Sequence, residues 1–80
     1  MPKSTDSQRY STLLKLLTER RKALGLSQAT LADRLGRIQT FVSKYERGER
    51  RLDIIEFLDI ANALNLDPGR IIRQLGTSHD

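Results

Sequence analysis

Apolar residues recur at helical spacing along most of the chain, in segments separated by glycine or by an Asp-Pro pair. No segment alternates apolar and polar residues over a length useful for a strand. Gly25, Gly36 and Gly48 each follow an apolar-periodic segment, where a helix commonly ends in a left-handed residue. The sequence therefore predicts an all-α fold, with helices over about 7–24, 28–35, 39–47, 54–64 and 68–75.

These helices form one expected domain, residues 7–75, and the polar ends, 1–6 and 76–80, are expected to be disordered. The first helix has an apolar stripe that consists of Tyr10, Leu13, Leu14, Leu17 and Leu24. The fourth helix has polar residues only at every third position, so we expect it to be buried around most of its circumference. Its apolar residues are Ile54, Ile55, Phe57, Leu58, Ile60, Ala61 and Leu64.

The third predicted helix has two distinct faces when residues are placed at about 100° intervals. Its apolar face consists of Ile38, Phe41, Val42 and Tyr45. Its opposite face consists of Gln39, Thr40, Ser43, Lys44 and Arg47. This second face carries hydrogen-bonding groups and positive charge but no carboxylate, which suits the edges of bases and the phosphates beside them.

The net charge of +4 is concentrated around this helix. Between Arg34 and Arg51 there are six basic and two acidic residues, so this window carries the whole excess, and the remainder is balanced. A basic patch is typical of a protein that binds a polyanion. A solvated helix face is the alternative, but the apolar pattern independently orients the patch outward.

Several function classes are disfavoured by composition. The chain has no cysteine, which excludes disulfides and thiolate metal sites and favours a reducing compartment. The one histidine, His79, lies next to the last residue, so we expect no enzyme, no metal site and no cofactor. We find no apolar signal core and no run long enough for a membrane span, so a cytoplasmic protein is expected.

Arg21 interrupts the apolar stripe of the first helix, because it lies almost three full turns after Tyr10. A guanidinium there needs an acceptor, since an unpaired buried charge is very costly. Glu46, at the seam between the two faces of the third helix, is the best candidate. We therefore predict an Arg21–Glu46 ion pair; the alternative is that Arg21 extends to solvent.

Together these segments resemble the phage repressor/Cro (XRE-like) helix-turn-helix family over about residues 13–72. The resemblance rests on Leu26-Ser27-Gln28, Leu31-Ala32, Leu35-Gly36, Gln39, Val42-Ser43, Glu46-Arg47-Gly48, Ala61 and Leu64. It implies a compact five-helix repressor-like domain in which helices two and three form the helix-turn-helix. The third helix would enter the major groove of DNA.

The resemblance also implies roles for individual residues. Gln28 would contact a phosphate and brace Gln39, which would bond to an adenine. Thr40, Ser43 and Lys44 are further candidates for base contacts, with Lys44 suited to guanine acceptors. The expected phosphate contacts come from Gln28, Arg37, Arg47, Arg50 and Arg51.

Two residues depart from the family pattern in the turn before the third helix. Arg37 occupies a position that is commonly small or apolar, which suggests a backbone or base contact. Ile38 replaces the usual Ser or Thr cap, so the helix lacks an ordinary side-chain cap. Phe41 is large for its position. It belongs either in the core, which we expect, or against a thymine methyl group.

The leading interpretation is a sequence-specific double-stranded DNA-binding protein that acts as a transcriptional regulator, with repression the first expectation. One recognition helix reads one half-site, so we expect a homodimer on a roughly palindromic operator. The expected dimer interface is the exposed side of Ile71, Ile72 and Leu75. The alternative is that these side chains pack on the chain's own core. A second interpretation is an antitoxin or restriction–modification controller that also binds a partner protein.

Overall fold

A computed structural model describes residues 8–77, which contain five α-helices and no strand. The helices are α1 (Gln8–Ala23), α2 (Gln28–Leu35), α3 (Gln39–Glu46), α4 (Ile54–Ala63) and α5 (Pro68–Gly76). The all-α prediction is confirmed, and most helix ends lie within one or two residues of those expected. The expected tail at 1–6 and residues 78–80 lie outside the described residues.

Side-chain caps and glycines explain where several of these helices begin and end. The hydroxyl of Ser27 accepts a hydrogen bond from the Thr30 backbone N–H at 3.0 Å, and Asp67 caps α5 before its first-turn Pro68. Gly36 ends α2 at a φ of 68°, a left-handed conformation that favours glycine. These local signals place α2 and α3 on either side of a short turn.

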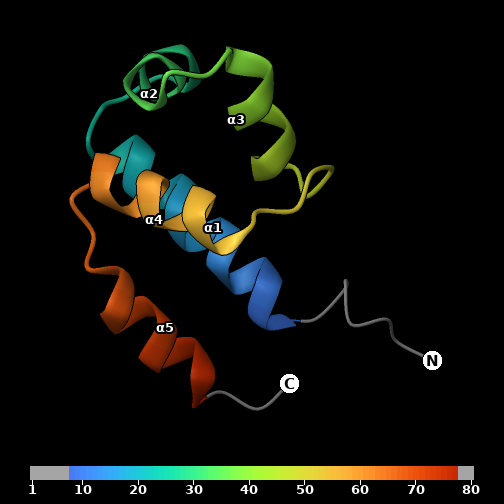
Figure 1. The fold of residues 1–80 in the computed structure, drawn as a ribbon, viewed down its shortest axis with the longest axis vertical. Coiled ribbons are helices and arrows are strands. Elements are labelled where there is room, and N and C mark those ends of the chain that lie inside the picture. Colours follow the sequence, from blue (N-terminus) through green and yellow to red (C-terminus); the bar gives the residue numbers. More distant parts are fainter. Residues whose placement is uncertain (1–7, 78–80) are drawn as a thin grey trace.

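The helices are arranged along the longest axis of the molecule (Figure 1). In that view α2 and α3 lie at one end, α1 and α4 cross in the middle, and α5 lies at the opposite end. The core runs through the junction of the first four helices, and α5 adds Ile71 to it. Its largest fully buried side chains are Leu17, Leu31, Val42, Tyr45, Ile60 and Leu64.

Two expectations about burial were wrong. Leu24 is 38% exposed, because α1 ends at Ala23 and the chain turns away at Gly25. Ile54 and Ile55 are 58% and 61% exposed, because α2 and α5 pack on only part of the α4 surface. α4 is therefore buried on one face and not around most of its circumference.

The end of α5 also differs from the prediction. The helix includes Gly76, which the sequence analysis assigns to the tail, and Thr77 follows as its C-cap. The Thr77 backbone N–H donates to the Arg73 carbonyl, and the Thr77 hydroxyl donates to the Gln74 carbonyl. These two carbonyl groups of the last turn therefore have hydrogen-bond partners within the helix end.

An ion pair between Arg21 and Glu46 fastens α3 to α1. Arg21 Nε lies 2.7 Å from Glu46 Oε2, Arg21 Nη2 lies 3.1 Å from Oε1, and the side chains are 9% and 6% exposed. Arg21 Nη1 donates to the Leu26 carbonyl at 2.7 Å. The hydrogen bond to Glu46 raises the pKa of Arg21 above its ordinary value. The guanidinium is therefore paired as the sequence predicted, and it does not extend to solvent.

We expect Arg21→Met to destabilise the protein strongly when Glu46 is intact and much less in a Glu46→Gln background. Removing one member of a buried pair leaves an uncompensated charge, at a cost of about 3–5 kcal/mol. Urea midpoints of the two single variants and the double variant should give a coupling free energy of about 2 kcal/mol. Equal losses in both backgrounds would show that the two side chains are not coupled.

Candidate nucleic-acid interface

The two faces of α3 are divided between the core and the surface. Phe41, Val42 and Tyr45 are buried, and the Phe41 and Tyr45 rings lie 5.5 Å apart between centroids. Phe41 therefore belongs to the core, as expected. The polar face consists of Gln39, Thr40 and Lys44, which are exposed, and Ser43, which is half-buried.

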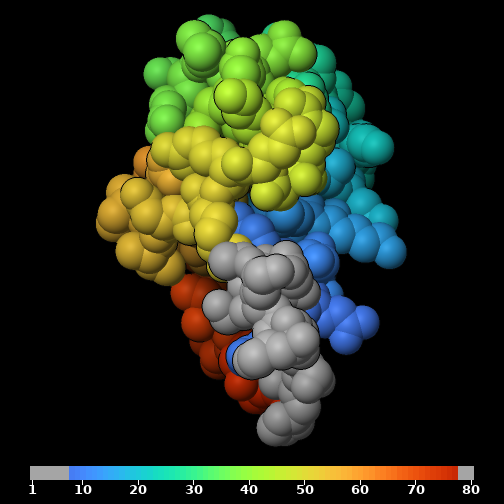
Figure 2. Space-filling view, turned by 90° about the vertical axis from the view of Figure 1, so that its right-hand side faces the viewer, coloured from blue at the N-terminus to red at the C-terminus, as the bar shows by residue number. Residues whose placement is uncertain are grey.

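In Figure 2, α3 lies in the upper part of the molecule, in green, and the segment that follows it lies directly below, in yellow. The sequence window that holds the excess positive charge includes both. No carboxylate projects from the exposed face of α3 itself, since Glu46 is turned inward to Arg21. This end of the molecule therefore presents amides, hydroxyls and cations together.

A chain of hydrogen bonds connects the buried ion pair to the first residue of α3. Gln28 Nε2 donates to Glu46 Oε1 at 2.9 Å, and Gln39 Nε2 lies 3.5 Å from Gln28 Oε1. The carboxylate fixes which end of the Gln28 amide faces it, so the Gln28 oxygen is the atom presented to Gln39. The amide of Gln39 is thereby oriented from within the protein.

Arg37 and Arg50 lie over the ring of Phe41, with guanidinium carbons 3.9 Å and 4.9 Å from its centroid. Both also reach Glu56 of α4. Arg50 Nη1 and Nη2 donate to its two oxygens at 2.9 Å and 2.7 Å, whereas Arg37 Nη1 lies 3.5 Å away. The expected phosphate contacts Arg37 and Arg50 thus both have an internal carboxylate partner.

Glu56 joins this cluster to the start of α4. Its side chain accepts from the Asp53 backbone N–H at 3.0 Å, and the Asp53 side chain accepts from the Glu56 N–H at 2.7 Å, which completes a capping box. Hydrogen bonds from Arg50 and from the Asp53 backbone lower the pKa of Glu56 to about 2. Sequence reasoning identified the Asp53 cap but missed Glu56, although the D-x-x-E spacing was visible.

The remaining two expected phosphate contacts lie after α3. Arg47 donates to Glu49 at 2.9 Å and 3.2 Å and to the Ser43 hydroxyl at 2.5 Å. The guanidinium carbon of Arg51 lies 4.1 Å from the centroid of the Tyr10 ring. Both side chains are exposed, so their cationic groups are accessible at the molecular surface.

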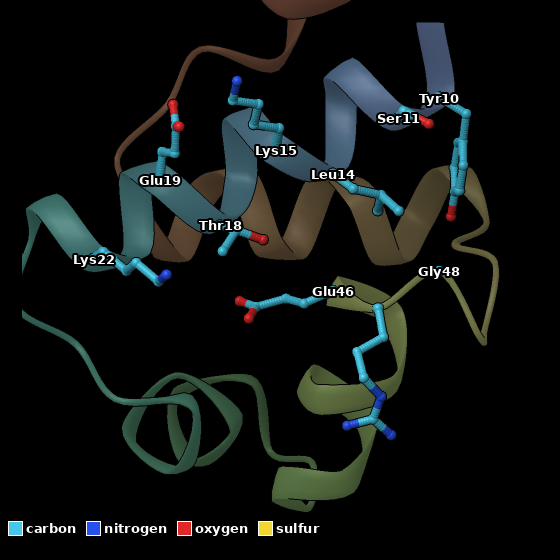
Figure 3. A pocket seen from close by; sticks show the side chains of 10 residues that line it. Tyr10, Ser11, Leu14, Lys15, Thr18, Glu19, Lys22, Glu46 and Gly48 are labelled. Carbon is cyan, nitrogen blue, oxygen red and sulfur yellow. The ribbon is translucent and has the colours of Figure 1, made fainter. Parts of the chain in front are cut away.

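A separate groove lies between α1 and the end of α3 (Figure 3). Glu46 extends toward α1 below Thr18, while Lys15 and Glu19 project from α1 away from α3. The Glu46 carboxylate is already engaged by Arg21 and Gln28. The buried carboxylate of the groove is therefore already paired, and we assign the groove no ligand.

The geometry of α2, the Gly36 turn and α3 defines a helix-turn-helix protein. α3 lies across α2 with its polar face outward, which is the arrangement of a recognition helix. Neither a cluster of metal-ligating side chains nor a helix able to cross a membrane occurs within residues 8–77.

Comparison with known proteins agrees with this geometry. A family model described as helix-turn-helix matches residues 17–71, so the chain belongs to the helix-turn-helix family, of the XRE type. The chain is similar to an XRE-family-like protein from Pseudomonas syringae pv. tomato, with a TM-score of 0.80 and 51% identity over 85% of this chain and 83% of that one.

Two further relatives carry functional descriptions. The structure of the restriction-modification controller protein C.AhdI from Aeromonas hydrophila has a TM-score of 0.67 and 37% identity, over 81% of this chain and 99% of that one. An uncharacterized transcriptional regulator in the ATPase CF(0) region of Rhodospirillum rubrum is 48% identical over 46 residues. That match covers 58% of this chain and only 43% of the relative.

The pKa of Glu56 predicts how stability depends on pH. The folded value of about 2 lies below the ordinary value of 4.5, so ionised Glu56 stabilises the folded state above about pH 4.5. This contribution is lost as the pH falls through about 2. We expect the free energy of unfolding of Glu56→Gln to fall less over this range than that of the unmodified protein.

Chemical denaturation at a series of pH values would measure this difference. Asp59→Asn is the matched control, because it removes a nearby carboxylate of the same helix that pairs with neither Arg37 nor Arg50, and it should retain the full acid-dependent loss. A Glu56→Gln variant with the same acid-dependent loss as the unmodified protein would contradict the pairing with Arg50.

Proposed function

We propose that the protein is a sequence-specific double-stranded DNA-binding transcriptional regulator that reads the major groove with α3. The observation that carries this proposal is the exposed face of α3, which presents Gln39, Thr40 and Lys44 while its one carboxylate is buried against Arg21. A merely solvated helix has no need to neutralise its acidic residue internally. Membership of the helix-turn-helix family supports the same assignment.

Gln39 is the proposed adenine contact, because a side-chain amide can bond bidentately to adenine and this amide is held by Gln28. Lys44 and Thr40 are proposed to contact neighbouring base edges, with Ser43 close to them. Gln28, Arg37, Arg47, Arg50 and Arg51 remain proposed phosphate contacts. For Arg50 a phosphate would have to compete with Glu56.

The roles of base and phosphate contacts can be separated with one pair of variants. Gln39→Ala should lower discrimination at one base pair by about 1–3 kcal/mol, the range for a good bidentate contact. Arg47→Ala should weaken binding to all sequences alike and reduce the salt slope by about 1. Fluorescence anisotropy titrations at several salt concentrations, on a duplex selected from random sequences and its single-base variants, would measure both.

Arg70→Ala is the charge-matched control, because it removes the same charge from exposed α5 at the far end of the molecule. It should leave the salt slope nearly unchanged. An unaltered base preference in Gln39→Ala would remove that residue from the reading face.

We propose that the regulator binds as a homodimer to a roughly palindromic operator. Of the three residues expected at the interface, Ile71 is buried at 5% exposure, Leu75 is half-buried and Ile72 is 47% exposed. Ile72 and Leu75 line a shallow apolar groove together with Ile54 of α4 and Leu13 of α1. This groove is the surface that supports self-association best.

Sedimentation or light scattering over a range of concentrations should show a dimer that Ile72→Glu dissociates, because a charge would have to be buried in the apolar groove. Ile55→Glu is the control, since Ile55 is 61% exposed but does not line the groove. A strict monomer at high concentration would contradict the homodimer.

A second candidate function is favoured by the similarity to a restriction-modification controller, which extends over 99% of that chain. A controller would use the same α3 face. A restriction or methylation gene beside the gene for this chain, or an operator in front of such a gene, would favour this role over a general repressor.

A further inference from the structure

From its position and exposure, we infer that Ile38 is a specificity-determining residue that contacts the 5-methyl group of one thymine in the operator. This inference deepens the proposed function and rests on it. Ile38 is 73% exposed, which is more than the other large apolar side chains on the described surface, Leu24, Ile54, Ile55 and Ile72.

Ile38 occupies the N-cap position of α3, where its backbone is extended and its side chain makes no cap hydrogen bond. A Ser, Thr, Asp or Asn at an N-cap stabilises a helix by about 1 kcal/mol relative to an apolar residue. Ile38 therefore neither caps α3 nor adds to the core. The isolated chain gains little from an isoleucine at this position.

The surroundings of Ile38 indicate what it contacts instead. It immediately precedes Gln39, the proposed adenine contact, at the exposed start of the recognition helix. Ile38 lines a shallow hollow together with Gly36, Thr40, Phe41 and the cationic residues Arg37, Lys44 and Arg50. An apolar side chain between cations matches a base edge that lies between phosphates.

The thymine methyl group is the apolar feature of the major-groove edge, and it has no counterpart in the degenerate pattern of the minor groove. A thymine neighbouring the base pair read by Gln39 would place that methyl group at the N-terminal end of α3. Removing one methyl group from water is worth about fourfold in affinity, which corresponds to about 0.8 kcal/mol.

The test replaces each thymine of a selected duplex by deoxyuridine, one at a time, which deletes only the methyl group. Dissociation constants are measured by fluorescence anisotropy at fixed salt. We expect about a fourfold loss at one thymine in each half-site and little change at the others.

Ile38→Ser is the informative variant, because serine can cap α3 while it removes the apolar contact. It should bind the thymine and deoxyuridine duplexes equally and retain or raise the thermal midpoint. Ile38→Ala should lose the same discrimination without adding a cap. Ile55→Ser, at another exposed isoleucine, should retain the fourfold difference.

The outcomes separate this inference from the proposed function. A fourfold difference that persists in Ile38→Ser, or equal binding of every deoxyuridine duplex by the unmodified protein, would overturn the role of Ile38 and leave α3 as the reading helix. A protein that selects no duplex from random DNA would overturn the proposed function itself.

Discussion

The buried pair of Arg21 and Glu46 is the constraint on which the rest of the site depends. Taking two charges out of water is expensive, and their attraction compensates only when geometry is good and further hydrogen bonds are made. Both conditions hold here. Arg21 Nε lies 2.7 Å from Glu46 Oε2, Arg21 also donates to the Leu26 carbonyl, and Glu46 also accepts from the Gln28 amide. The pair joins α1, the start of α2 and the end of α3, so it fixes the orientation of the recognition helix relative to the core.

The same ion pair also affects the charge of the surface around α3. A carboxylate at the seam of α3 would repel phosphates if it were exposed, but Glu46 is 6% exposed and neutralised. The positive charge around α3 is nevertheless smaller than the excess of +4 in residues 34–51, because Glu56, which lies outside that window, pairs with Arg50; Glu49, already counted in it, pairs with Arg47. In the proposed complex, phosphates exchange with these carboxylates, so the base contacts proposed for the uncharged Gln39 and Thr40 gain weight relative to general electrostatic attraction.

The parts of the structure that periodicity controls could be predicted from sequence. Arg21 stood out because it occupied an apolar stripe, and the two faces of α3 followed from helical spacing. The exposure of Ile54 and Ile55 could not be predicted, because spacing along one helix does not tell how many neighbours cover it. The Arg50–Glu56 contact depends on the path of the loop between α3 and α4, which no periodic pattern encodes. The D-x-x-E capping box was the one local signal for Glu56.

The stability of α3 comes almost entirely from tertiary contacts. It has eight residues, no side-chain N-cap and no acidic residue in its first turn, so it would be marginal as an isolated helix. Phe41, Val42 and Tyr45 anchor it in the core, and Glu46 ties its end to Arg21. Since these residues hold the helix from its inner face and its last turn, the exposed side chains at its start, Ile38, Gln39 and Thr40, are not needed for core packing. The DNA contacts that we propose for these three residues therefore do not compete with the folding of α3.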